Sequence, residues 1–179
     1  MTGNQNNLNP KPSNALNNPN RPVENVSWDD IQVFLNRLNE QQADNLSVGW
    51  SYVLPTESQW EYACRAATKT AYSWGDDITS TNANYNNNIG HTKNVGDYAA
   101  NPWGFFDMHG NVREWTADAY QSTYPTGNPV IDPTFPGTTT SSRVERGGSF
   151  GTSPTRVRSA LRRESGHGFK EGWLGFRLS

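Results

Sequence analysis

The chain has 179 residues and a mass of 20.0 kDa, which suits a single domain. Hydrophobic residues make up only 33% of it, whereas its 16 Gly and 11 Pro favour many loops. The single cysteine excludes an intrachain disulfide and a cysteine-rich zinc site. No apolar run is long enough to span a membrane, and Met1 to Asn20 lacks the pattern of a signal peptide. We therefore expect a soluble protein.

The formal net charge of −2 is unevenly distributed. Residues 143–179 contain eight Lys or Arg against three Glu, so the rest of the chain is acidic. A basic end can attract nucleic acid or acidic ligands. The arginines alternate here with Gly, Ser and apolar residues, which is more typical of side chains that hold loops together. We expect no nucleic-acid partner.

Residues 1–21 are rich in Asn and Pro and are expected to form an N-terminal loop or tail before a domain at 22–179. Ser27 has the character of a helix N-cap, and the two acids that follow it suit the first turn of a helix. Apolar residues then recur at helical spacing, which predicts a helix with one buried face. They are Ile31, Phe34, Leu35 and Leu38.

A second helix is predicted after Thr56, which forms a capping-box pattern with Gln59. Its apolar stripe consists of Trp60, Ala63, Cys64 and Ala67. On such a stripe Cys64 is expected to be a small core residue rather than a nucleophile. A short strand is predicted just before this helix, over 50–54.

After Thr70 no helical period remains, and short aromatic segments alternate with Gly, Asn, Pro and Asp. Strand-like runs follow at 144–150, 157–162 and 175–178. This pattern predicts an α+β domain with two early helices, short antiparallel strands and many loops. Buried aromatic side chains or a bound Ca²⁺ could order such loops. We expect Trp60, Trp103 and Trp115 to be core anchors.

Six segments occur in a characteristic order: PVENVSW (22–28), LPTESQWEYA (54–63), NPWGFFDMHGNVREW (101–115), RGGSF (146–150), RSALR (158–162) and GFR (175–177). Together they resemble the formylglycine-generating enzyme, or sulfatase-modifying factor, family. The resemblance implies that family's loop-rich variant of the C-type-lectin fold. Arg113 departs from the pattern, because the family usually has Trp at this position.

The resemblance also implies which chemistry is missing. Formylglycine-generating enzymes bind copper with two cysteines that follow the Gly-Gly-Ser turn, whereas residues 147–158 contain none. Thiolate is the ligand that selects Cu(I), so we expect no copper. Related sulfoxide synthases use a three-His iron site, but His91, His109 and His167 lie in unrelated loops. A Ser149–His109–Asp107 triad is also disfavoured, because no nucleophile elbow is present.

A calcium site is the metal site that the resemblance favours. The family positions correspond to Asp107, Gly110, Val112 and Glu114, and two carboxylates with two backbone carbonyls suit Ca²⁺. In the alternative, Asp107 caps a turn and Glu114 pairs with Arg113 or with an arginine near the C-terminus.

The C-terminal pattern also resembles the variable proteins of diversity-generating retroelements, which use this fold and diversify surface residues there. The exposed ligand-binding candidates are Thr152, Ser153, Thr155, Arg156, Arg163, Ser165, His167, Phe169 and Trp173. We therefore expect a non-oxidase binding or display domain that recognises a protein or peptide through its C-terminal loops. The alternative is a formylglycine-generating-type oxidoreductase that acts on a sulfatase cysteine.

Overall fold

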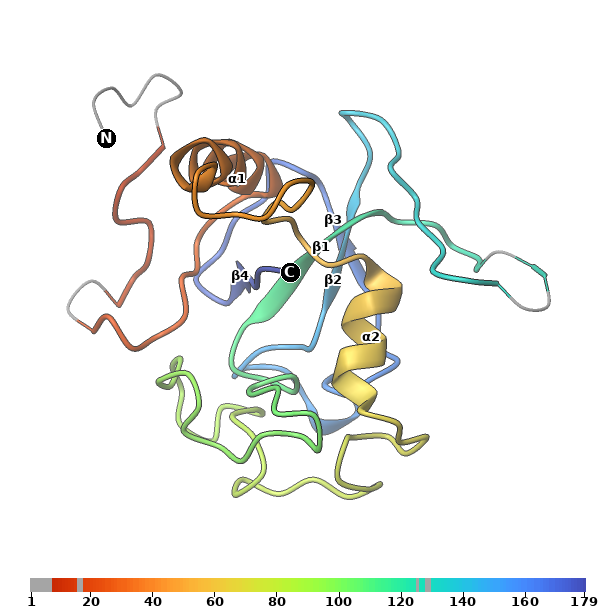
Figure 1. Ribbon diagram of the computed structural model, residues 1–179. Coiled ribbons are helices and arrows are strands. Elements are labelled where there is room, and N and C mark those ends of the chain that lie inside the picture. The colour runs from red at the N-terminus through yellow and green to blue at the C-terminus, as the bar shows by residue number, and fades with distance from the viewer. Residues whose placement is uncertain (1–7, 16–17, 125, 128–129) are drawn as a thin grey trace.

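The computed structural model describes residues 8–15, 18–124, 126–127 and 130–179 (Figure 1). A four-stranded sheet in the order β3-β2-β1-β4 lies at its centre. The strands are β1 (Arg113–Ala119), β2 (Arg143–Arg146), β3 (Arg163–Ser165) and β4 (Leu174–Phe176). The pairs β1–β2 and β2–β3 are antiparallel, whereas β1–β4 is parallel. The predicted α+β, loop-rich fold class is confirmed, with a sheet that is mixed.

The strand predictions differ in detail from the structure. The predicted runs at 144–150 and 175–178 contain parts of β2 and β4. The predicted strand at 157–162 is wrong, because the 3-10 helix η1 (Pro154–Arg156) and a turn precede β3. The strand predicted at 50–54 is also wrong, although Val53 exchanges two backbone hydrogen bonds with Ser179, of 3.1 and 2.9 Å.

Helix α1 (Trp28–Gln42) begins where the sequence predicts. The Ser27 side chain accepts a hydrogen bond from the Asp30 backbone N–H, and the Asp30 carboxylate accepts one from the Ser27 N–H. Ile31 and Leu35 are buried in a core cluster with Trp115 of β1. Phe34, predicted on the same stripe, is 37% exposed and packs edge-on against Phe176.

Helix α2 (Glu57–Arg65) has the predicted capping box between Thr56 and Gln59. Trp60 and Cys64 pack against Met108 in a second core cluster. Ala67 lies beyond the helix and is exposed, because Ala66 takes a left-handed conformation and ends α2. Successive residues of a strand point to opposite faces, so Trp115 faces α1 while its neighbour Glu114 faces α2.

Of the three predicted tryptophan anchors, Trp60 and Trp115 are confirmed at 1% and 0% exposure. The prediction for Trp103 is wrong: it is 42% exposed and packs edge-on against Tyr62, with ring centroids 4.7 Å apart. Between α2 and β1 the chain runs as loops, which form the lower part of the molecule in Figure 1. Trp103 lies in these loops rather than in one of the core clusters.

Part of the predicted N-terminal tail contacts the domain. The Asn14 N–H donates to Glu24 Oε1 at 2.5 Å, and the Asn25 side chain donates to the Pro12 carbonyl at 3.0 Å. Residues 1–7 and 16–17 of the predicted tail lie outside the described residues. Neither of the two α-helices in the described ranges combines the length and the apolar character that crossing a membrane requires.

Candidate functional site

Glu114, a predicted calcium ligand, lies in β1 and is only 5% exposed. Its Oε2 accepts hydrogen bonds from Trp60 Nε1 at 2.6 Å and from Arg177 Nε at 2.5 Å. Its Oε1 accepts a third from Arg177 Nη2 at 2.6 Å. A guanidinium that pairs with both oxygens of a carboxylate leaves it little capacity for a cation. Glu114 therefore joins β1 to α2 and to the C-terminal segment.

The other three predicted calcium ligands, Asp107, Gly110 and Val112, lie in the turns just before β1. Asp107 Oδ2 accepts a hydrogen bond from the Gly96 N–H at 2.8 Å, and burial raises the pKa of its carboxyl. The Gly110 N–H donates to the Gly147 carbonyl at 2.9 Å, and Val112 is buried. A calcium ion at these four residues would have to displace Arg177 from Glu114. The observed arrangement does not fit the ion and instead matches the alternative, with a capped turn and an arginine pair.

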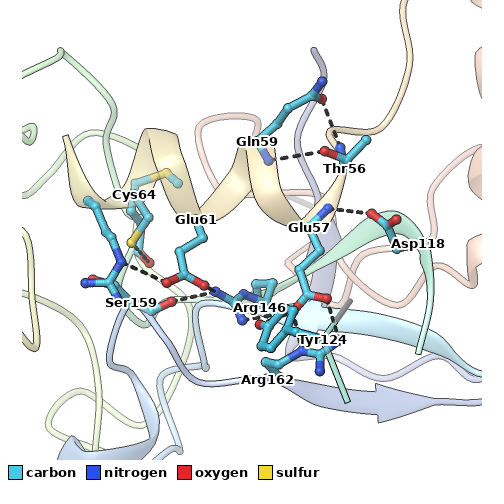
Figure 2. Close-up of polar contacts among 12 residues, drawn as sticks. Thr56, Glu57, Gln59, Glu61, Cys64, Asp118, Tyr124, Arg146, Ser159 and Arg162 are labelled. Atoms are coloured by element: carbon cyan, nitrogen blue, oxygen red, sulfur yellow. Dashed lines mark hydrogen bonds and ion pairs between the residues drawn. The ribbon is translucent and has the colours of Figure 1, made fainter. Parts of the chain in front are cut away.

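Arginines of the RGGSF and RSALR segments meet the acids of α2 (Figure 2). Arg146, whose side chain is fully buried, donates to Glu57 at 3.0 Å, to the Ser159 carbonyl at 2.7 Å, and to Glu61. Arg162 forms a two-pronged pair with Glu57, with distances of 2.5 and 2.6 Å. This network connects α2, β2 and the segment before β3. These arginines hold the loops together, as their spacing in the sequence indicates.

The only thiol lies in a closed environment. Cys64 is 0% exposed, its Sγ lies 3.6 Å from His109 Nε2, and burial raises the pKa of the thiol to about 12. A thiol with such a pKa stays protonated near neutral pH, where the thiolate would be the nucleophile. The predicted core role of Cys64 is confirmed.

His109 is held as a neutral ring. Its Nδ1 donates to the Val157 carbonyl at 2.8 Å, and its Nε2 accepts from the Ser73 N–H at 3.2 Å. Burial lowers the pKa of His109 to about 4. The Ser149 hydroxyl contacts Thr152 at 3.0 Å instead of the imidazole, so the structure does not assemble the Ser149–His109–Asp107 triad.

The three histidines do not converge either. His91 Nδ1 lies against the Thr92 carbonyl at 2.8 Å, and His167 Nδ1 lies 2.6 Å from Asp29 Oδ2 of α1. Within the described ranges, no group of three or more His, Cys, Asp or Glu side chains is placed to hold a metal ion.

The predicted ligand-binding residues separate into three sets. The exposed ones are Thr155, Arg156, Arg163 and Phe169, and the partly buried ones are Ser153, Ser165, His167 and Trp173. The expectation that Thr152 is exposed is wrong. It is 6% exposed, because its hydroxyl accepts from the Ser149 N–H at 2.9 Å and closes a turn.

Arg113 joins this region, although the sequence marks it only as a departure from the family pattern. Its N–H donates to the Trp173 carbonyl at 2.8 Å, and its Nη1 lies 3.4 Å from Glu145 Oε2. Arg163 Nε lies 4.0 Å from the same oxygen. The sequence carries one signal for Arg113: a charged residue stands where the family usually has Trp.

Comparison with known proteins places the chain in a family. Residues 2–179 match the model of the sulfatase-modifying factor enzyme 1-like domain. The chain is 33% identical over 186 residues to a formylglycine-generating enzyme of Streptomyces coelicolor. This alignment covers 93% of this chain and 55% of that protein. The Mus musculus formylglycine-generating enzyme is 28% identical, over 93% of this chain and 46% of its own length. The chain thus spans about half the length of these curated relatives.

Two solved structures share the fold over most of the chain. Treponema denticola variable protein 1 superposes with a TM-score of 0.77 and 26% identity, over 94% of this chain and 76% of that one. PvdO from Pseudomonas aeruginosa superposes with a TM-score of 0.79 and 26% identity, over 90% of this chain and 62% of the PvdO chain. Its motifs, its fold and these matches show that the chain belongs to the sulfatase-modifying factor enzyme 1-like domain family.

Proposed function

We propose that this chain is a binding domain that recognises a protein or peptide through its C-terminal loops. The observation that carries the proposal is a contrast between two sets of side chains. Arg146 and Glu114, in the family-like segments, are buried and engaged by several partners, so they support the fold. Between those segments, Phe169 is 40% exposed and the Arg156 side chain has no hydrogen bond or ion pair with the described residues.

Side chains without a structural partner are the ones free to contact a ligand, and exposed aromatic and arginine residues are enriched at binding surfaces. The similarity to Treponema denticola variable protein 1 supports the comparison with variable proteins of diversity-generating retroelements. In that comparison, the segment from the Gly147–Gly148 turn to Arg177 presents the ligand-contacting loops.

The names of the relatives favour the alternative, a formylglycine-generating oxidoreductase. In the family resemblance that chemistry uses two thiols with copper, and this chain has one cysteine. Cys64 is buried, and its pKa of about 12 disfavours the thiolate that Cu(I) requires. We therefore assign the chain a binding role without oxidase chemistry.

Selection from a phage-displayed library of random peptides tests this role. Selected peptides are expected to bind the purified domain, and Phe169→Ala is expected to weaken their binding by about tenfold, as for an aromatic contact residue. Val48→Ala is the matched control, because Val48 is fully exposed in the loop after α1. No enrichment of peptides, or equal binding by both variants, would overturn the proposal.

A further inference from the structure

We propose that Arg113, Arg156 and Arg163 form an anion site that anchors an acidic side chain of the bound peptide. This inference rests on the proposed peptide-binding function and names the chemistry of the ligand. The site lies where β1, β2 and β3 run side by side. Trp173 accepts a backbone hydrogen bond from Arg113, and the end of η1 lies against Gly148, which follows β2.

The sheet register brings Arg113 and Arg163 together. Glu145 of β2 pairs with Trp115 of β1 on one side and with Arg163 of β3 on the other. Arg113 precedes Trp115 by two residues, so its side chain leaves the same face of the sheet. Both guanidinium groups approach one atom, Glu145 Oε2, with distances of 3.4 Å from Arg113 Nη1 and 4.0 Å from Arg163 Nε.

These pairs leave positive charge and hydrogen-bond donors unused. Glu145, whose side chain is fully buried, supplies one carboxylate for the guanidinium groups of Arg113 and Arg163. Arg113 Nε is buried and has no hydrogen-bond partner, and both contacts to Glu145 are long. Arg156 adds a third guanidinium, exposed and with no side-chain partner among the described residues.

The charges also act on one another. Burial lowers the pKa of Arg113, and the positive charges of Arg163 and Arg156 lower it further, while Glu145 opposes both effects. The fold brings Arg156 to the same end of β2, because a Cβ built on Gly148 would lie only 2.9 Å from the Arg156 carbonyl oxygen. Both neighbouring charges therefore act on Arg113. A carboxylate among them would relieve that repulsion and accept hydrogen bonds from a planar fork that matches its geometry.

The surroundings favour a peptide over a nucleic acid. Binding of nucleic acid generally uses a basic stripe that follows the phosphate backbone, and the chain has a net charge of −2. Here the positive charge is a compact cluster, and the exposed ring of Phe169 lies in the loop that follows β3. A cluster of this size suits one acidic side chain, with an apolar side chain of the peptide against the aromatic ring.

Fluorescence anisotropy with a fluorescein-labelled hexaglutamate peptide tests the site. The peptide is expected to bind, to dissociate as salt is added, and to bind about tenfold more weakly to Arg156→Gln, since charge-assisted hydrogen bonds are lost. Arg156→Gln is the decisive variant because this side chain makes no hydrogen bond or ion pair with the described residues. Arg113→Gln is expected to act in the same direction, although it also leaves the buried Glu145 with a weaker partner.

The matched control is Arg158→Gln, an exposed arginine two residues further on whose Nε donates to the Thr155 carbonyl. It is expected to leave binding unchanged. Equal losses in Arg156→Gln and Arg158→Gln, or tighter binding of a single-stranded oligothymidylate than of the peptide, would overturn the inference. If selected peptides lack acidic residues and bind Arg156→Gln normally, this inference alone fails. If no peptide is enriched, the binding function itself fails.

Discussion

Replacement of Arg146 by Met tests whether the buried arginine network holds the fold. Arg146 is 1% exposed and donates to Glu57, Glu61 and the Ser159 carbonyl. Met retains much of the apolar stem but removes these hydrogen bonds and leaves Glu57, 6% exposed, with only Arg162 as a cationic partner. Breaking a buried pair by removing one partner costs about 3–5 kcal/mol, so the free energy of unfolding should fall by that amount.

The assay is thermal and guanidinium-induced unfolding, followed by circular dichroism. In a protein of this size about 1 kcal/mol corresponds to about 2–4 °C, so the melting temperature should fall by about 6–20 °C. Lys170→Met is the control, because Lys170 is 54% exposed at its side chain and lies 3.6 Å from Asp30. An exposed pair contributes less than about 1 kcal/mol. An Arg146→Met melting temperature as close to wild type as that of Lys170→Met would refute this reasoning.

Four further outcomes are expected. Trp60→Ala should lower the free energy of unfolding by about 3–5 kcal/mol in urea titrations, whereas Trp103→Ala, at an exposed ring, should change it by less than about 1 kcal/mol; similar losses would contradict their placement. The folded-state pKa of His109, about 4, lies below its unfolded value of 6.5, so the unfolded chain binds the proton more readily. Stability from this residue is present above pH 6.5, and about 3 kcal/mol of it is lost as the pH falls to about 4. His109→Gln should remove that loss, and an unchanged pH profile of its urea midpoint would count against the buried neutral ring. Millimolar Ca²⁺ should leave the melting temperature of the wild type unmoved and raise that of Arg177→Gln, in which Glu114 is released; stabilisation of the wild type by calcium would show that the ion displaces Arg177. Finally, a sulfatase peptide incubated with the protein and copper should keep its thiol in mass spectrometry, and copper-dependent loss of that thiol would restore the oxidase alternative.

The two helices could be predicted from the sequence because their start signals are local. Ser27 and Thr56 each cap a helix with a partner three residues away, and the apolar stripes follow within two turns. β1 was not predicted, although residues 114–119 alternate polar and apolar side chains. Both faces of the strand are largely buried, and the partners of its buried acids Glu114 and Asp118 lie more than 50 residues away in α2, which no local pattern reveals. The run at 157–162 misled for a related reason. Ser159 is buried because its N–H donates to the distant Ala71 carbonyl, which no local pattern reveals.

The candidate site was predictable only in part. The exposed loop residues follow from the family-like segments that flank them, since residues between such segments are under less structural constraint. The pairing of Glu114 with Arg177 spans 63 residues, and sequence spacing could suggest a C-terminal arginine but could not choose it. Arg113 reaches Glu145 and Trp173 only through the sheet register, so its place beside Arg163 emerges from the fold.

A crystal structure of the domain with a selected peptide tests the central claim most directly. The account predicts that the peptide lies over the loops from Thr155 to Trp173, with an acidic side chain within hydrogen-bond distance of Arg156. The competing surface is a mainly apolar groove of about 470 Å³, whose apolar lining includes Val23, Phe34, Val95, Phe105, Phe106 and Phe176. A peptide bound in that groove, with Arg156 and Phe169 left free, would contradict the account.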